Sequence, residues 1–87
     1  MIVVGGDKTL EAAEFELNKA KKISSKATIY QREKSYRTVI TEITKSDEEV
    51  QLLAEAKTIF KDAYVRTESE WCNQIIESDK YFICETK

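Results

Sequence analysis

Two tyrosines and two arginines are the side chains of this 87-residue chain best suited to bind a ligand: Tyr30, Arg37, Tyr64 and Arg66. Tyrosine rings stack against the apolar faces of sugars, and arginines hydrogen-bond hydroxyl and carboxylate groups. The same residue types also suit single-stranded nucleic acid, whose bases stack on aromatic rings. A third interpretation is an ordinary solvated sheet face, because cross-strand tyrosine and threonine pairs stabilise sheets.

Catalytic chemistry is not predicted. The chain has no His, and its only two glycines, Gly5 and Gly6, cannot form a Walker-type phosphate loop. The acidic residues fall mostly on the surfaces of predicted helices, where solvated charge is the usual explanation. We therefore expect a protein that is not an enzyme and that uses no cofactor or metal.

The two cysteines, Cys72 and Cys84, lie close together near the C-terminus. Without His, two cysteines cannot supply a structural zinc site of four soft ligands. A disulfide, as in an exported protein, and two reduced, half-buried thiols fit the sequence equally well.

The charge balance restricts the partners. Fourteen basic residues against 16 acidic ones give a net charge of −2, which argues against non-specific nucleic-acid binding and against polybasic attraction to a membrane surface. The first apolar run, Ile2 to Val4, is far shorter than the roughly 20 residues that cross a bilayer, and the sequence has no signal-peptide pattern. We expect no membrane insertion, and one domain taken from a longer protein whose other parts decide its localisation.

Hydrophobic periodicity divides residues 2–66 into alternating strands and helices. Leu10, Ala13, Leu17 and Ala20 fall on one helical face, and Ser46 begins a sequence typical of a capping box. Gly5-Gly6-Asp7 is predicted to end the first strand in a turn. The predicted strands are 2–5, 27–31, 36–43 and 63–66, the predicted helices are 9–24 and 47–60, and a loop of about four residues, 32–35, joins the middle strands.

An internal repeat organises these elements. The two halves align at a constant offset of 36, so that Val3 matches Val39 and Leu17 matches Leu53. Two strand–helix–strand units joined by a hairpin predict an α+β, ferredoxin-like β-α-β-β-α-β fold over residues 1–66. Its four-stranded antiparallel sheet has the first and third strands inside, and right-handed crossovers place both helices on one face.

Residues 67–87 form a C-terminal extension outside the repeat. A short helix is predicted over 68–76 and a further strand over 80–85. We expect Trp71, Ile75 and Phe82 to pack against the domain and to cover either Phe15 or an open sheet edge.

The other sheet face is predicted to be free. Side chains alternate along a strand, so Ala27, Ile29, Thr38, Ile40, Ala63 and Val65 should face the helices. The residues expected on the free face are the candidate binding residues Val3, Thr28, Tyr30, Arg37, Val39, Tyr64 and Arg66.

Residues 2–66 resemble a SPOR domain, the sporulation-related repeat of bacterial cell-envelope proteins. The resemblance is carried by Val3-Val4-Gly5-Gly6, Tyr36-Arg37-Thr38-Val39-Ile40, Ser46-Asp47-Glu48-Glu49 and Ala63-Tyr64-Val65-Arg66. It implies a non-catalytic module that binds peptidoglycan glycan strands stripped of their stem peptides, as at division septa, through the free sheet face. It also implies that the module targets an attached protein within the cell envelope.

Departures from the family pattern leave a second hypothesis open. Val3 stands where the family often has glutamine, Asp7 and Ile43 stand where it often has phenylalanine, and Thr41-Glu42 replaces a Gly-Pro pair. The alternative is a protein–protein interaction domain that keeps the fold but has lost glycan binding, within a larger multidomain protein, for which the cytoplasm is then the expected location.

Overall fold

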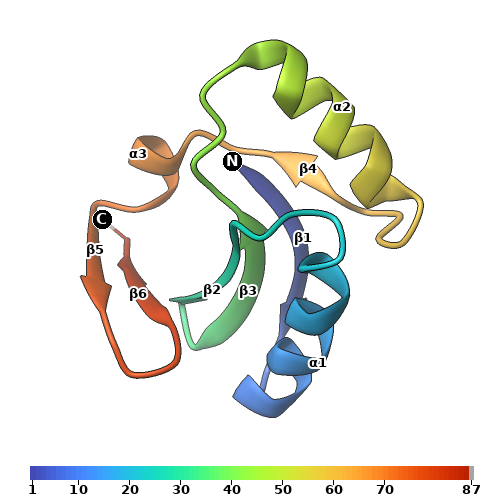
Figure 1. Cartoon of the computed structure of the whole chain (residues 1–87). Coiled ribbons are helices and arrows are strands. Elements are labelled where there is room, and N and C mark those ends of the chain that lie inside the picture. The colour runs from blue at the N-terminus through green and yellow to red at the C-terminus, as the bar shows by residue number, and fades with distance from the viewer. Residues whose placement is uncertain (87) are drawn as a thin grey trace.

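The computed structural model describes residues 1–86; residue 87, the last of the predicted extension, lies outside them. The described part is α+β, with three helices and six strands (Figure 1). The helices are α1 (Leu10–Ala20), α2 (Ser46–Lys57) and α3 (Glu68–Trp71). The strands are β1 (Ile2–Asp7), β2 (Ala27–Arg32), β3 (Ser35–Ile40), β4 (Tyr64–Val65), β5 (Gln74–Glu77) and β6 (Phe82–Glu85).

The sheet has the strand order β4-β1-β3-β2-β6-β5. The predicted inner position of β1 and β3 among the first four strands is confirmed, and these strands pair antiparallel. The prediction of a four-stranded antiparallel sheet is wrong, because β6 pairs in parallel with the outer edge of β2 and β5 continues the sheet beyond it. The extension thus covers the edge of β2, which would otherwise be open, and the prediction that it covers an open sheet edge is confirmed.

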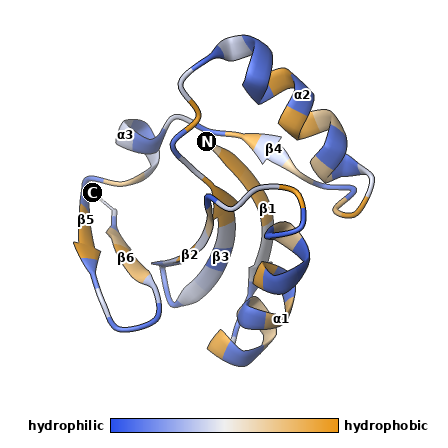
Figure 2. Cartoon of the chain, viewed as in Figure 1, coloured by the Kyte–Doolittle hydropathy of each residue, from blue (hydrophilic) through white to orange (hydrophobic). Residues whose placement is uncertain are grey.

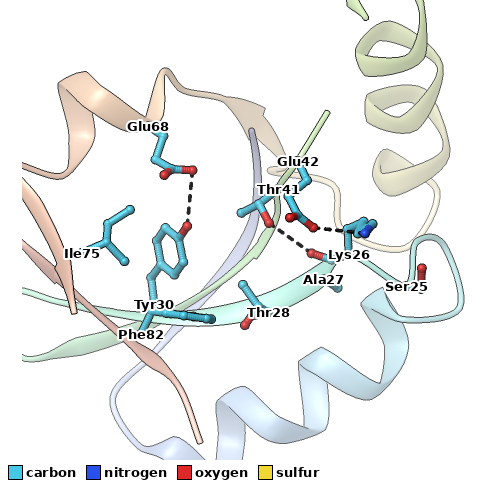
Figure 3. Close-up of a pocket in the computed structure, with 10 residues that line it drawn as sticks. All are labelled: Ser25, Lys26, Ala27, Thr28, Tyr30, Thr41, Glu42, Glu68, Ile75 and Phe82. Carbon is cyan, nitrogen blue, oxygen red and sulfur yellow. Dashed lines mark hydrogen bonds and ion pairs between the residues drawn. The ribbon is translucent and has the colours of Figure 1, made fainter. Parts of the chain in front are cut away.

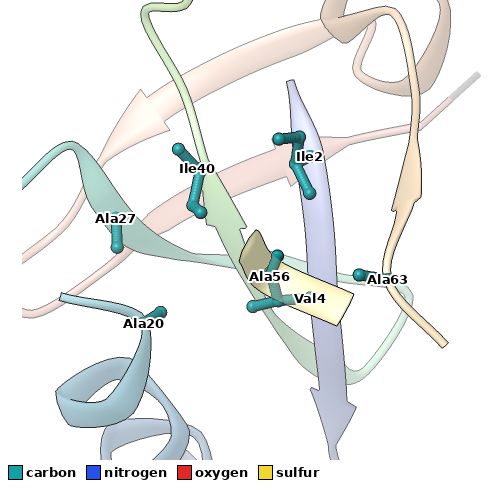
Figure 4. Packing of buried hydrophobic residues seen from close by; sticks show 7 residues of the cluster. All are labelled: Ile2, Val4, Ala20, Ala27, Ile40, Ala56 and Ala63. Atoms are coloured by element: carbon teal, nitrogen blue, oxygen red, sulfur yellow. The ribbon is translucent and has the colours of Figure 1, made fainter. Parts of the chain in front are cut away.

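The main core lies between the sheet and the two long helices, α1 and α2. Thr9 caps α1 by accepting a hydrogen bond from the Ala12 backbone at 3.2 Å. Figure 2 shows apolar residues along β1, and Figure 4 shows how alanines from the helices approach the strands. Alanine at these positions lets each helix lie close to the sheet. The buried residues of this core are Ile2, Val4, Ala20, Ala27, Ile40, Ala56 and Ala63.

The opposite sheet face is covered by the C-terminal extension. Trp71 is 8% exposed and packs with Val3, Tyr30 and Val39 in a second hydrophobic cluster. The expectation of a free face is therefore wrong at its centre. Covering of Phe15, the other predicted role of the extension, is also wrong, because Phe15 remains 64% exposed on α1.

Several predicted boundaries differ in the structure. The first strand continues through Gly5 and Gly6 to Asp7, and the middle hairpin has a two-residue loop, Glu33 and Lys34, with φ of 52° and 68°. Left-handed φ at both loop residues matches the right-handed twist of the strands. The predicted capping box is wrong, because Lys45 occupies the N-cap of α2 without a side-chain hydrogen bond. The predicted helix 68–76 ends at Trp71 and is followed by strand β5.

Cys72 and Cys84 form a disulfide. Their Cα atoms are 5.1 Å apart, and both side chains are buried in the second cluster. Of the two arrangements that fitted the sequence, the structure contains the disulfide. It ties the end of α3 to β6, which lies between β2 and β5, and so fixes the segment that carries Trp71 to the sheet.

Candidate functional site

The seven predicted binding residues lie on or beside the face opposite the long helices, but the extension separates them. Val39 is completely buried, Val3 is 2% exposed and Tyr30 is 5% exposed, all in contact with the Trp71 cluster. Arg37, Tyr64 and Thr28 are half-buried, and Arg66 is exposed. The accessible residues therefore fall into two hollows, one on each side of the docked segment.

The first hollow, here called the edge hollow, has a volume of about 360 Å³ and lies where β1 runs past the end of β4. It contains three of the predicted residues, Val3, Arg37 and Tyr64, and Arg66 stacks on the Tyr64 ring at 4.4 Å. The full lining consists of Val3, Val4, Gly5, Gly6, Glu16, Arg37, Phe60, Lys61, Asp62 and Tyr64.

The edge hollow exists because β4 is short. β4 pairs only with Ile2 and Val3, so in residues 1–86 no strand lies beside the outer edge of β1 from Gly5 onward. The pairing of β1 with β3 shifts between Val3 and Gly5, which marks a β-bulge. The hollow is thus a gap in the sheet edge rather than a groove across the sheet.

The two glycines let charged side chains lie flat against β1. A Cβ on Gly5 would collide with the Glu16 carboxylate, and a Cβ on Gly6 would lie 3.0 Å from Arg37 Cδ. Glycine in a strand often marks such a close approach. Because neither glycine has a side chain, Glu16 can lie against one face of β1 at Gly5, and Arg37 can lie against the other face at Gly6.

The lining of the edge hollow carries two basic side chains, Arg37 and Lys61, and two acidic ones, Glu16 and Asp62. Arg37 donates from Nε to Ser35 Oγ at 3.0 Å, and its guanidinium lies 6.0 Å from the Trp71 ring. Lys61 and Asp62, which also line the hollow, are exposed, and the exposed Arg66 reaches the hollow only through its stacking on Tyr64. The basic groups can donate charge-assisted hydrogen bonds to carboxylates or hydroxyls, while the Phe60 and Tyr64 rings supply apolar surface.

Glu16, which lines the hollow, interacts with the carboxyl group of Asp7, which does not line it. Burial, followed by the nearby Asp7 carboxylate, raises the pKa of Glu16 from its ordinary value of 4.5, against the opposing effect of Lys19. Asp7 Oδ2 and Glu16 Oε2 are buried without hydrogen-bond partners in the described residues. A proton shared between Glu16 and Asp7 would give both oxygens a hydrogen-bond partner and remove the repulsion between the two charges. Glu16 is therefore protonated at a higher pH than a free glutamate.

The second hollow, here called the tail groove, has a volume of about 610 Å³ and lies between β2 and the extension (Figure 3). Glu68 Oε2 accepts a hydrogen bond from the Tyr30 hydroxyl at 3.3 Å, and Lys26 Nζ pairs with Glu42 Oε2 at 3.2 Å. Its lining is Ser25, Lys26, Ala27, Thr28, Tyr30, Thr41, Glu42, Glu68, Ile75 and Phe82. The predicted residues Thr28 and Tyr30 belong to this groove and not to the edge hollow.

The Tyr30 ring is part of the structure of the groove rather than an open stacking surface. It packs edge-to-face on Phe82 with ring centroids 5.9 Å apart. Burial, and next the Glu68 carboxylate, raise the pKa of Tyr30 to about 12. A sugar ring therefore cannot lie flat on Tyr30 unless the extension moves.

Sequence reasoning missed several lining residues of the two hollows. Lys61 and Phe60 follow α2 in a turn that carried no binding signal, and Glu68 contacts Tyr30 across 38 positions of the chain. The glycine pair was the one available signal, but it was interpreted as a turn.

Within residues 1–86, no three metal-ligating side chains come together as a metal site would require, and no helix is long and apolar enough to span a membrane. No family model matches the chain, and no curated protein and no solved structure is significantly similar to it.

Proposed function

We propose that this chain is a non-catalytic, SPOR-like binding module that recognises peptidoglycan glycan strands stripped of their stem peptides. We interpret β4-β1-β3-β2, with α1 and α2, as a ferredoxin-like core to which the extension adds two strands. The observation that carries the proposal is the gathering of Arg37, Tyr64 and Arg66 around the edge hollow.

The chemistry of a stripped strand suits this hollow. Removal of a stem peptide by an amidase leaves the lactyl group of muramic acid as a free carboxylate. Arg37 and Lys61 line the hollow and can bind that anion through charge-assisted hydrogen bonds, which contribute about 1.5–3 kcal/mol each, against the opposing charge of Asp62. An intact strand has amide-linked peptides in place of these carboxylates, so the same residues would favour the stripped form.

The disulfide supports an exported protein. Disulfides persist in oxidising compartments such as the bacterial periplasm and are rare in the cytosol. Cys72 and Cys84 are joined in the structure, which agrees with a cell-envelope location better than with a cytosolic one.

Co-sedimentation with purified sacculi tests the proposal. Wild-type protein should pellet more strongly with amidase-treated sacculi than with intact sacculi. The double variant Arg37→Gln, Lys61→Gln should lose about tenfold or more in affinity, since each tenfold corresponds to about 1.4 kcal/mol. Lys22→Gln, Lys57→Gln is the matched control, because it removes the same charge from two exposed positions, one in the turn after α1 and one at the end of α2. Equal pelleting by the two double variants contradicts the proposed site.

A protein-interaction domain is the second candidate, and the covered sheet face favours it. Val3, Tyr30 and Val39, three of the seven predicted glycan contacts, are buried by the chain's own extension. Under this hypothesis the tail groove, with a volume of about 610 Å³, is the place where a partner would bind. Folded wild-type protein that pellets with neither form of sacculus would favour this candidate over glycan binding.

A further inference from the structure

We propose that two copies of this chain associate through the outer face of α1, packed antiparallel across a twofold axis at Phe15. The outer face is the side of α1 turned away from the sheet, and its residues are all exposed: Glu11, Ala12, Phe15, Asn18 and Lys19. The proposal is independent of glycan binding and rests on a different surface.

The two sides of α1 differ in burial. Ala13 and Ala20 face the sheet and are completely buried, whereas Phe15 is 64% exposed on the helix that Figure 1 shows beside β1. Residues three and four apart share a helical face, so Glu11 and Lys19 flank Phe15. Lys19 Nζ lies 4.8 Å from the centroid of the Phe15 ring and covers only a part of it. A single exposed aromatic side chain is ordinary, so the argument depends on what surrounds it.

A hollow of about 540 Å³ lies beside Phe15, at the N-terminal half of α1. Its lining is Asp7, Thr9, Glu11, Ala12, Phe15 and Glu16. Three of these side chains carry carboxyl groups and none is basic, so the hollow is complementary to a cation. Phe15 and Ala12 add apolar surface. Together these features suit a lysine side chain, whose stem is apolar and whose end is charged.

The charges of the outer face are complementary to themselves. Phe15 is the middle residue of α1, with Glu11 one turn before it and Lys19 one turn after it. When a second copy packs antiparallel about Phe15, each Glu11 lies opposite Lys19 of the other copy, which also brings that lysine to the hollow that Glu11 lines. A parallel arrangement would place like charges against each other. Charge therefore selects both the occupant, a second copy, and its direction.

The size of the contact predicts a weak dimer. α1 has 11 residues, which makes it about 16 Å long. One such face cannot bury the roughly 1,200–2,000 Å² of a stable complex, so we expect association only at high protein concentration. At the low concentrations used for unfolding experiments, the chain is then a monomer.

Analytical ultracentrifugation of the oxidised full chain at low salt tests the proposal, at protein concentrations from about 10 μM to about 1 mM. The wild type should pass from monomer to dimer over this range, and added salt should weaken the dimer because its ion pairs are exposed. Phe15→Glu should raise the Kd about tenfold or more, since it replaces the apolar centre of the contact with two carboxylates. Val50→Glu is the matched control, at a side chain that is 70% exposed on α2, and should leave the Kd unchanged. A wild type that stays monomeric throughout, or a dimer that Phe15→Glu does not weaken, would overturn the proposal.

Charge reversal tests the antiparallel arrangement. Glu11→Lys and Lys19→Glu should each raise the Kd of the homodimer about threefold to tenfold, because like charges then meet at both pairs and exposed pairs are individually weak. In an equimolar mixture of the two variants both pairs join opposite charges, so heterodimers should form at least as readily as the wild-type dimer. Asp47→Lys and Lys57→Glu make the same charge changes on α2, and each should self-associate like the wild type. A mixture that associates no more strongly than its separate variants contradicts the antiparallel pairing and the proposal with it.

Discussion

Breaking the Cys72–Cys84 disulfide should destabilise the whole domain, because the bond constrains the segment that completes the second hydrophobic cluster. The two cysteines are separated by 12 positions. A loop of that size loses about 3 kcal/mol of stabilisation when it is opened, according to the chain-entropy relation. Domains of this length are stable by only about 5–15 kcal/mol, so the expected loss is a large part of the total.

Urea unfolding measures this loss. With an m-value of about 1 to 1.5 kcal/mol/M, the midpoint of the reduced protein should lie about 2 to 3 M below that of the oxidised protein. Trp71 fluorescence follows the extension and far-UV circular dichroism follows the main core, and the two transitions should coincide if the extension is part of one cooperative unit. The variant Cys72→Ala, Cys84→Ala should behave like the reduced protein and should not respond to dithiothreitol. Oxidised and reduced midpoints that agree would refute the reasoning.

Three further predictions concern single side chains. Trp71→Ala should cost about 3–5 kcal/mol of unfolding free energy, whereas Phe15→Ala, at a side chain that is 64% exposed, should change it by less than about 0.5 kcal/mol; chemical denaturation distinguishes the two. The pKa of Glu16 is raised in the folded state, so its protonated form stabilises the fold below pH 4.5, and this stabilisation is lost as the pH rises through the folded-state pKa. Glu16→Gln should therefore reduce the fall in melting temperature over that pH range, which a series of thermal melts measures. Tyr30, whose pKa is raised to about 12, should ionise well above the ordinary value of 10 in an ultraviolet titration, and Glu68→Gln should lower its pKa.

Much of the fold could be predicted because its signals are local and repeated. Alternation along residues 27–31 and 36–40 correctly separated the side chains that face the helices from those that do not. The offset of 36 between the halves identified β1 and β3 as the inner strands of the first four. These inferences depend on periodicity within a few residues, which the sequence records directly.

The extension could not be placed from the sequence because its contacts are long-range. Trp71 packs on Tyr30 and Val3 from short elements whose own patterns are weak. β6 pairs in parallel with β2, a register that no turn between them specifies. Without that pairing, the sheet face appeared free, and three of its residues were counted as accessible.

The candidate site was predicted in part, and both errors arise because the sequence does not record which elements pack against the sheet. Residue types and strand alternation placed Arg37 and Tyr64 on the correct face, but whether a face is accessible depends on what packs against it. The glycines were interpreted as a turn, since both a turn and a close approach to a strand favour glycine. A turn and a close approach can be told apart only once it is known that Glu16, a residue of α1, lies against Gly5.

The same extension that limits the binding surface also compensates for a modest core. The buried core under α1 and α2 consists largely of alanine and of small aliphatic side chains, and the helices expose Phe15 and Val50. Large aromatic groups are concentrated instead on the opposite face, where Trp71 and Phe82 pack against Tyr30. A small domain buries a limited fraction of its surface, so a second cluster closed by a disulfide adds stability that the first cannot supply. Stability and restricted access to the sheet therefore have one cause, and a variant that opens the face should unfold more easily.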